Sequence, residues 1–175
     1  KSINPSKYDE VVGYVNSADE TLAERAVESA WNAFETWSKT PAHIRAEYML
    51  KAAKRIKERR FEFDAWLVYE VGKSWVEADA DVAEAIDFLE YYSRDMLRYA
   101  SDQPLVRIPG ENNELRYIPL GVGAIIPPWN FPLAILVGMT SSAVVTGNTV
   151  ILKPASDSPI IGAKFFEVLQ EIGLP

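Results

Sequence analysis

The chain has 175 residues, of which 48% are hydrophobic and 25% are charged, and its formal net charge is -7 at pH 7. This composition is typical of a globular protein with a sizeable core, and the acidic balance argues against a general nucleic-acid binder. The residues include no cysteine, no cluster with metal-ligand spacing and no apolar run long enough to span a bilayer, so neither thiol chemistry, a metal centre nor membrane binding is expected from them.

The first hundred residues are predicted to be mostly helical. A short strand or extended arm is expected in Lys1–Asn16, which alternates weakly around Val11–Val15, before the first helix. Capping patterns at Ser17–Glu20, Thr40–Pro41 and Ser74–Glu77 are typical of helix starts, and Gly72 is a typical residue after a helix end. Helices are therefore expected at 17–38, from 40 onward, at 61–71 and at 74–99.

Two short alternating segments follow in residues 103–120. Leu105–Ile108 and Leu115–Ile118 flank a loop that contains a Pro–Gly pair. Alternating segments on either side of a turn predict a β-hairpin.

The remaining residues predict a strand–helix–strand unit. Gly121–Ile126 and Thr149–Leu152 are apolar throughout, as are strands of a parallel sheet that is covered on both faces. A ligand site of such a unit lies beyond the carboxyl ends of the strands. A sheet of two strands leaves an unpaired edge, so we expect the chain to be part of a longer protein.

Asn130 lies in a stiff loop at the end of the first of these strands. Pro127, Pro128 and Pro132 surround it, and they exclude a helix interior or a ladder interior. The commoner role for an asparagine just before a proline is a helix N-cap. Held rigidly at the mouth of a sheet, the same amide could instead donate a hydrogen bond to an oxyanion, which typically contributes about 3–4 kcal/mol in a transition state.

Lys153 follows the second strand. It is either a solvated charge or a donor to sugar hydroxyls or phosphate in the ligand crevice. The usual dinucleotide fingerprint is not present, because Ile126 stands where its third glycine would follow Gly121 and Gly123. A nucleotide would have to be held in another way.

Glu84 lies inside the long helix expected at 74–99. It shares a stripe with Asp81 and Asp87 at three-residue intervals, and this spacing alone indicates a surface charge. The single histidine, His43, lies at a helix start, where nothing indicates a catalytic or metal-binding role.

Several of these segments together resemble the aldehyde dehydrogenase superfamily. The resemblance rests on PPWNFP at 127–132, on Gly147–Asn148 after the helix, and on KPA at 153–155. Within the superfamily, PASDSP at 154–159 and EADADVAEAIDF at 77–88 are most similar to the members that oxidise L-glutamate γ-semialdehyde. The resemblance covers essentially the whole chain, but only the front part of the family's longer chain.

This resemblance implies an α/β fold, the front part of a Rossmann-like NAD(P)-binding domain. Residues 1–102 would be its N-terminal helical part, residues 103–120 a hairpin arm for homo-oligomerisation, and residues 121–175 the first βαβα of the NAD(P)-binding sheet. The catalytic domain, with the nucleophilic cysteine and the general base, would lie outside this chain.

The resemblance also implies a reaction and a set of site residues. A cysteine thiolate attacks an aldehyde, a side-chain amide holds the oxyanion, and hydride passes to nicotinamide. Asn130 matches the amide donor, while Glu84 and Phe131 match residues of the substrate pocket. The remaining matches are to the cofactor site, along the strand-end wall and at the adenosine ribose: Ile126, Pro128, Trp129, Asn130, Lys153, Ala155 and Ser156.

Ser156 departs from many members of the family, which carry a glutamate there. That glutamate grips the ribose hydroxyls and repels a 2′-phosphate. We therefore expect NAD as the cofactor, with NADP tolerated.

Two other functions are compatible with the residues. The first is an aldehyde dehydrogenase for a different semialdehyde, such as succinic semialdehyde. The second is a non-catalytic nucleotide-binding or oligomerising module, which the lack of cysteine favours and the matched loops oppose.

Overall fold

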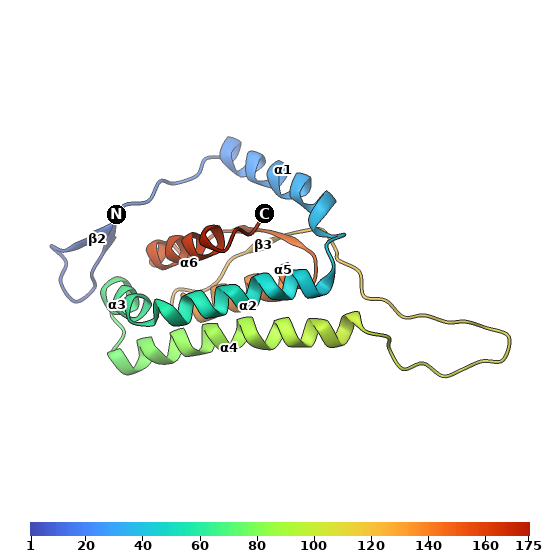
Figure 1. The fold of residues 1–175 in the computed structure, drawn as a ribbon. Helices are drawn as coiled ribbons and strands as arrows, with labels where there is room; N and C mark the ends of the chain where they lie inside the picture. The colour runs from blue at the N-terminus through green and yellow to red at the C-terminus, as the bar shows by residue number, and fades with distance from the viewer.

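The computed structural model describes all residues from 1 to 175. It contains six helices and four short strands (Figure 1). In chain order they are β1 (Ser2–Ile3), β2 (Val11–Gly13), α1 (Glu20–Trp37), α2 (Ala42–Glu58), α3 (Arg60–Val71), α4 (Trp75–Ala100), β3 (Val122–Ile125), α5 (Ala134–Val145), β4 (Thr149–Leu152) and α6 (Pro159–Glu171). None of the helices has the length and apolar character needed to cross a membrane.

The helices α2 and α4 run side by side and form the main helical layer (Figure 1). Helix α4 also packs on α3 and α5, while α1 and α5 both contact the strands β3 and β4. The core between these elements is apolar, and its largest fully buried side chains include Met49, Leu67, Leu89, Leu136 and Phe165. One continuous core therefore joins the helical part to the strand–helix–strand unit.

The caps of α3 and α4 confirm the sequence patterns. Helix α3 ends at Gly72, whose φ of 69° is the left-handed conformation that glycine adopts without strain. Ser74 and Glu77 form a complete capping box at the start of α4. Two other predicted caps are wrong: α1 is capped by Asp19 rather than Ser17, and α2 begins after Pro41 without any side-chain cap.

The strands β3 and β4 pair in parallel, as predicted, with Ile125 opposite Leu152. The prediction that both faces of these strands are fully covered is wrong for β4, because all four of its residues are only half-buried. A sheet of two strands is too narrow for its neighbouring helices to cover fully. The chain also forms a separate antiparallel pair, β1–β2, where one strand or arm was expected.

The predicted hairpin at 103–120 is not formed. These residues make a long loop that projects from the end of α4 (Figure 1), with one backbone hydrogen bond across the turn, from Glu111 N to Ile108 O. Apolar side chains along the loop are exposed, including Val106 at 87% and Ile118 at 78%. Cross-strand pairing would bury none of them against a core, so the chain alone provides little stabilisation for a ladder.

Candidate functional site

The carboxyl ends of β3 and β4 lie side by side. Lys153 N donates to Ile125 O at 2.9 Å, so the parallel register continues to the last residue before each loop. The loops 126–133 and 153–158 therefore leave the sheet at the same edge, which is where ligands of α/β sheets bind.

The loop after β3 ends in a helix that a distant carboxylate caps. Helix α5 has no side-chain cap of its own, and its first amide, Ala134 N, donates to Asp81 Oδ1 of α4 at 2.7 Å. Asp81 is fully buried, and its other oxygen accepts from Lys73 Nζ at 2.7 Å. A carboxylate at a helix N-terminus is favoured by both hydrogen bonding and the helix dipole.

The N-cap role considered for Asn130 is therefore wrong. The residue before α5 is Leu133, and the Asn130 side chain makes no hydrogen bond within the chain. Asn130 is exposed, so its amide group is available to a ligand.

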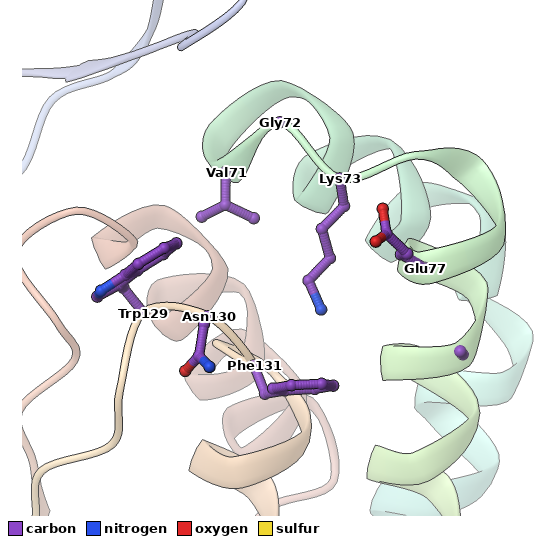
Figure 2. Close-up of a pocket in the computed structure, with 8 residues that line it drawn as sticks. Val71, Gly72, Lys73, Glu77, Trp129, Asn130 and Phe131 are labelled. Atoms are coloured by element: carbon purple, nitrogen blue, oxygen red, sulfur yellow. The ribbon is translucent and has the colours of Figure 1, made fainter.

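Asn130 borders a cleft of about 450 Å³ between this loop and the α3–α4 turn. Figure 2 shows the Lys73 side chain reaching into the cleft between Asn130 and Phe131 on one side and Glu77 on the other. The Lys73 ammonium lies 4.2 Å from the centroid of the Phe131 ring, a favourable cation–π contact. The other lining residues are Val71, Gly72, Ala80 and Trp129.

The predicted substrate-pocket residues are placed differently from one another. Phe131 lines the cleft and its side chain is 43% exposed. Glu84 lies one turn of α4 beyond Ala80, outside the residues that line the cleft, and it makes no ion pair or hydrogen bond. The structure therefore brings Asn130 and Phe131 together but does not bring Glu84 to them.

The predicted cofactor residues lie along the two strand ends. On the β3 side, Ile126 and Trp129 are 61% and 57% exposed, and Pro128 is exposed as well. On the β4 side, Lys153 is exposed and is absent from the ion pairs of the chain. Because the strands are adjacent, these side chains border one strip of surface.

A second hollow, of about 490 Å³, adjoins the first. Trp129 and Val71 line both, and the second is also bordered by Ser156 and Asp157 from the turn after β4. Ala155, in the same turn, is half-buried, and its carbonyl accepts from Ser158 N at 3.1 Å. The side chain of Trp129 thus lies between the cleft of Asn130 and the turn of Ser156.

Helix α6 holds this turn by direct contact. A Cβ atom added at Gly162 would lie 2.4 Å from Cγ of Pro154, well inside the normal contact distance of about 3.5–4.0 Å. The residue at 162 must therefore be glycine for the turn to approach the helix so closely.

A second buried carboxylate caps α6 in the same manner as Asp81 caps α5. Glu70 of α3 accepts hydrogen bonds from Ile160 N and Ile161 N, each at 2.8 Å, and from Ser2 Oγ at 2.8 Å. Burial raises the pKa of the Glu70 carboxyl, while the three hydrogen bonds oppose that rise.

Sequence reasoning missed Lys73, Asp81 and Glu70. One signal was available for Asp81, since it stands within the stripe of Ala78, Val82 and Ala85, all of which are fully buried. An acid in a buried stripe needs a partner, but the sequence does not identify it. No group of three or more potential ligands is arranged to hold a metal ion.

Comparison with known proteins places these features in context. The model of the aldehyde dehydrogenase family matches residues 1–175. The 1-pyrroline-5-carboxylate dehydrogenases of Geobacillus kaustophilus and Geobacillus thermodenitrificans are 56% and 55% identical over 174 residues, which are 99% of this chain and 34% of each relative. The chain thus spans about a third of the length of these curated relatives.

Solved structures agree with the sequence relatives. A 1-pyrroline-5-carboxylate dehydrogenase from Thermus with bound NAD superposes with a TM-score of 0.95 at 53% identity, over 99% of this chain and 34% of that one. Proline utilization A from Bdellovibrio bacteriovorus gives a TM-score of 0.97 at 42% identity, over 99% of this chain and 18% of that one.

Proposed function

The chain belongs to the aldehyde dehydrogenase family, and on this basis we propose that it forms part of an enzyme that oxidises L-glutamate γ-semialdehyde to L-glutamate with NAD. Glutamate γ-semialdehyde is the open form of 1-pyrroline-5-carboxylate, the compound named in the relatives at 53–56% identity. The observation that carries the proposal is the Asn130 amide, exposed beside a cleft, without an internal partner, on a loop that the fold holds in place.

Asn130 has the chemistry required of an oxyanion donor. When a nucleophile adds to the aldehyde carbon, the carbonyl oxygen gains negative charge, and the Asn130 Nδ2 hydrogen is free to donate to it. The two prolines before it and Pro132 after it restrict the loop, so little reorganisation is needed as the charge develops. The nucleophile itself is not among these residues, since the chain contains no cysteine.

The strand-end surface fits a dinucleotide. Lys153 offers an unpaired ammonium for ribose hydroxyls, and the exposed wall of Ile126, Pro128 and Trp129 offers apolar contact and backbone groups. Ala155 and Ser156 continue this surface in the turn that α6 supports. When NAD is bound, its nicotinamide accepts the hydride from the substrate; the residues of this chain bind and orient it.

Substitution of Asn130 tests the proposal in the enzyme that carries this chain. Asn130→Ala should lower kcat for NAD reduction by about a hundredfold, because one oxyanion donor typically contributes that much. Asn130→Asp, which keeps the shape but replaces the donor with a negative charge, should lower kcat at least as far. Asn32→Ala, at an exposed site on α1, is the matched control. A loss below about tenfold in Asn130→Ala would contradict the role.

The substrate and cofactor preferences need separate tests. Succinic semialdehyde, assayed beside glutamate γ-semialdehyde, should give the lower kcat/KM; the reverse order would refute the proposed substrate. Ser156 places no carboxylate beside the ribose, so NADP should support turnover, and Ser156→Glu should reduce NADP use more than NAD use. The account would be contradicted if NADP, supplied alone, gave no turnover at concentrations at which NAD saturates the enzyme.

The loop at 103–120 supports a further part of the proposal, which is that two copies of the chain pair through it. Its exposed apolar side chains, among them Val106, Ile118 and Leu120, have no cover within one chain. A charged substitution, Val106→Lys, should weaken self-association in sedimentation experiments, while Val76→Lys, at an equally exposed site on α4, should not.

A further inference from the structure

We infer that Asp81 and Lys73 are positioning residues for Asn130: together they fix the loop 129–133 and so set where the amide lies during the reaction. This inference rests on the proposed role of Asn130. It concerns Asp81 of α4 and Lys73 of the α3–α4 turn, and Lys73 also borders the cleft.

The loop has few other polar anchors. Asn130 makes no hydrogen bond within the chain, and the only backbone bond from residues 129–131 is the one that Ile135 N donates to Phe131 O at 3.2 Å. The polar contacts to another element are the hydrogen bond from Ala134 N to Asp81 and the cation–π contact of Lys73 with Phe131. The polar contacts that attach the loop to the helices are therefore made by these two residues, beside the apolar packing of Leu133 in the core.

The two contacts are linked through one carboxylate. Asp81 Oδ1 accepts from Ala134 N and Oδ2 accepts from Lys73 Nζ, each at 2.7 Å, so both oxygens are occupied. Lys73 is 11% exposed and Asp81 is fully buried, which means that the pair is shielded from solvent. Charge-assisted hydrogen bonds are short and strong in such surroundings. Asp81 therefore holds both the start of α5 and the Lys73 side chain in position.

The contact of Lys73 with Phe131 restrains the position of Asn130. The Lys73 ammonium, already bound to Asp81, lies 4.2 Å from the Phe131 ring centroid, and Phe131 is the next residue after Asn130. Three residues after Phe131, Ala134 N donates its hydrogen bond to Asp81, so the same carboxylate also holds the chain on that side. A shift of the carboxylate would therefore move the Asn130 amide, and a shift of about 1 Å at a catalytic group can cost about a hundredfold in rate.

Asp81→Asn is the direct test, because it keeps the volume but can accept only one of the two hydrogen bonds. The first measurement is hydrogen exchange in the complete enzyme, which does not depend on its reaction. Exchange should become faster at the amides of residues 131 and 133–137 and remain unchanged in α1. Unchanged exchange at 131–137 would overturn the inference even if the enzyme proved to have a different substrate.

The second measurement is a double-mutant cycle on kcat. Asp81→Asn alone should lower kcat by about tenfold with little change in the KM for NAD, but in the Asn130→Ala background it should lower kcat by less than about twofold. A residue that acts only on stability would cause the same loss in both backgrounds, and equal losses would refute positioning. If Asn130→Ala itself leaves kcat unchanged, the proposed function fails, while the exchange result still decides whether Asp81 holds the loop.

Lys73→Met provides a second variant in case Asp81→Asn does not fold. It keeps the hydrogen bond from Ala134 N to Asp81 and should show the same non-additivity with Asn130→Ala. Lys164→Met is its matched control, since Lys164 also combines an ion pair, to Glu167 at 2.8 Å, with a cation–π contact, to Trp66. The control should combine additively with Asn130→Ala. Additive behaviour of Lys73→Met would count against the inference.

Discussion

Replacement of Gly162 by alanine should weaken NAD binding although it improves helix propensity. In a helix interior, alanine is favoured over glycine by about 1 kcal/mol. The new Cβ, however, would lie 2.4 Å from Cγ and 2.9 Å from Cβ of Pro154, so the turn at 153–156 or α6 must move by more than about 1 Å to reach normal contact. Overpacking of this kind costs about 1–3 kcal/mol and therefore exceeds the gain.

The rigid proline ring cannot rotate away from the new methyl group, so the displacement reaches Lys153 and Ser156, its neighbours in the turn. If NAD binding requires the original position of the turn, the cost of about 1–3 kcal/mol is subtracted from the binding free energy. That corresponds to about a 5- to 150-fold higher Kd for NAD. Isothermal titration of the enzyme with NAD measures this directly. Gly123→Ala is the matched control, since its Cβ would meet only Val150 Cγ1, at 4.0 Å. The reasoning is refuted if Gly162→Ala binds NAD as tightly as Gly123→Ala.

Three further predictions concern the packing behind the site. Trp37→Phe removes the 2.9 Å hydrogen bond from the Trp37 indole N–H to Val144 O of α5, which keeps its backbone bond from Gly147 N, so amides near the end of α5 should open more easily by about 0.5–1.5 kcal/mol, measured by hydrogen exchange. Asn148→Ala removes the acceptor for two backbone N–H groups just before β3, and exchange at 120–121 should rise while exchange in α3 stays constant. Arg59→Met should lower the thermal midpoint at pH 7, because Arg59 joins α3 to α6 through carboxylates that include Glu62 and Glu171. The hydrogen bond from Arg59 lowers the pKa of Glu62, whereas the pKa of Glu171 is lowered first by its hydrogen bond from Arg55 and further by the charge of Arg59. The Arg59 contribution is therefore present above the ordinary carboxyl value of 4.5 and is lost as pH falls through the lowered pKa of the folded state. The difference between Arg59→Met and the parent should therefore shrink below pH 4.5; a constant difference would contradict this account.

Elements with local signals could be predicted from the sequence. The capping box at Ser74, the left-handed glycine after α3 and the apolar strands β3 and β4 each depend on residues within a few positions of one another. The family resemblance and the loop with Asn130 were recognisable for the same reason, since PPWNFP is a contiguous run.

Features that depend on distant partners could not be predicted. Asn130 had the sequence context of an N-cap, but Asp81, which lies 53 positions before Ala134, occupies that role. Glu70 is likewise 90 positions from Ile160. The loop at 103–120 has the alternation of a hairpin, but alternation produces strands only where one face is covered, and no covering surface is present within this chain.

The two distant caps also determine the order in which the chain can fold. Helices α5 and α6 begin without side-chain caps of their own, and their first turns are completed only by carboxylates of α4 and α3. A growing α5 or α6 thus has no side-chain cap at its start until α3 and α4 have formed and docked. We expect α3 and α4, which are consecutive in sequence, to pack together early. The loops 126–133 and 153–158 should become ordered in a late step. Substitutions at Asp81 or Glu70 should then mainly accelerate unfolding and leave the folding rate nearly unchanged.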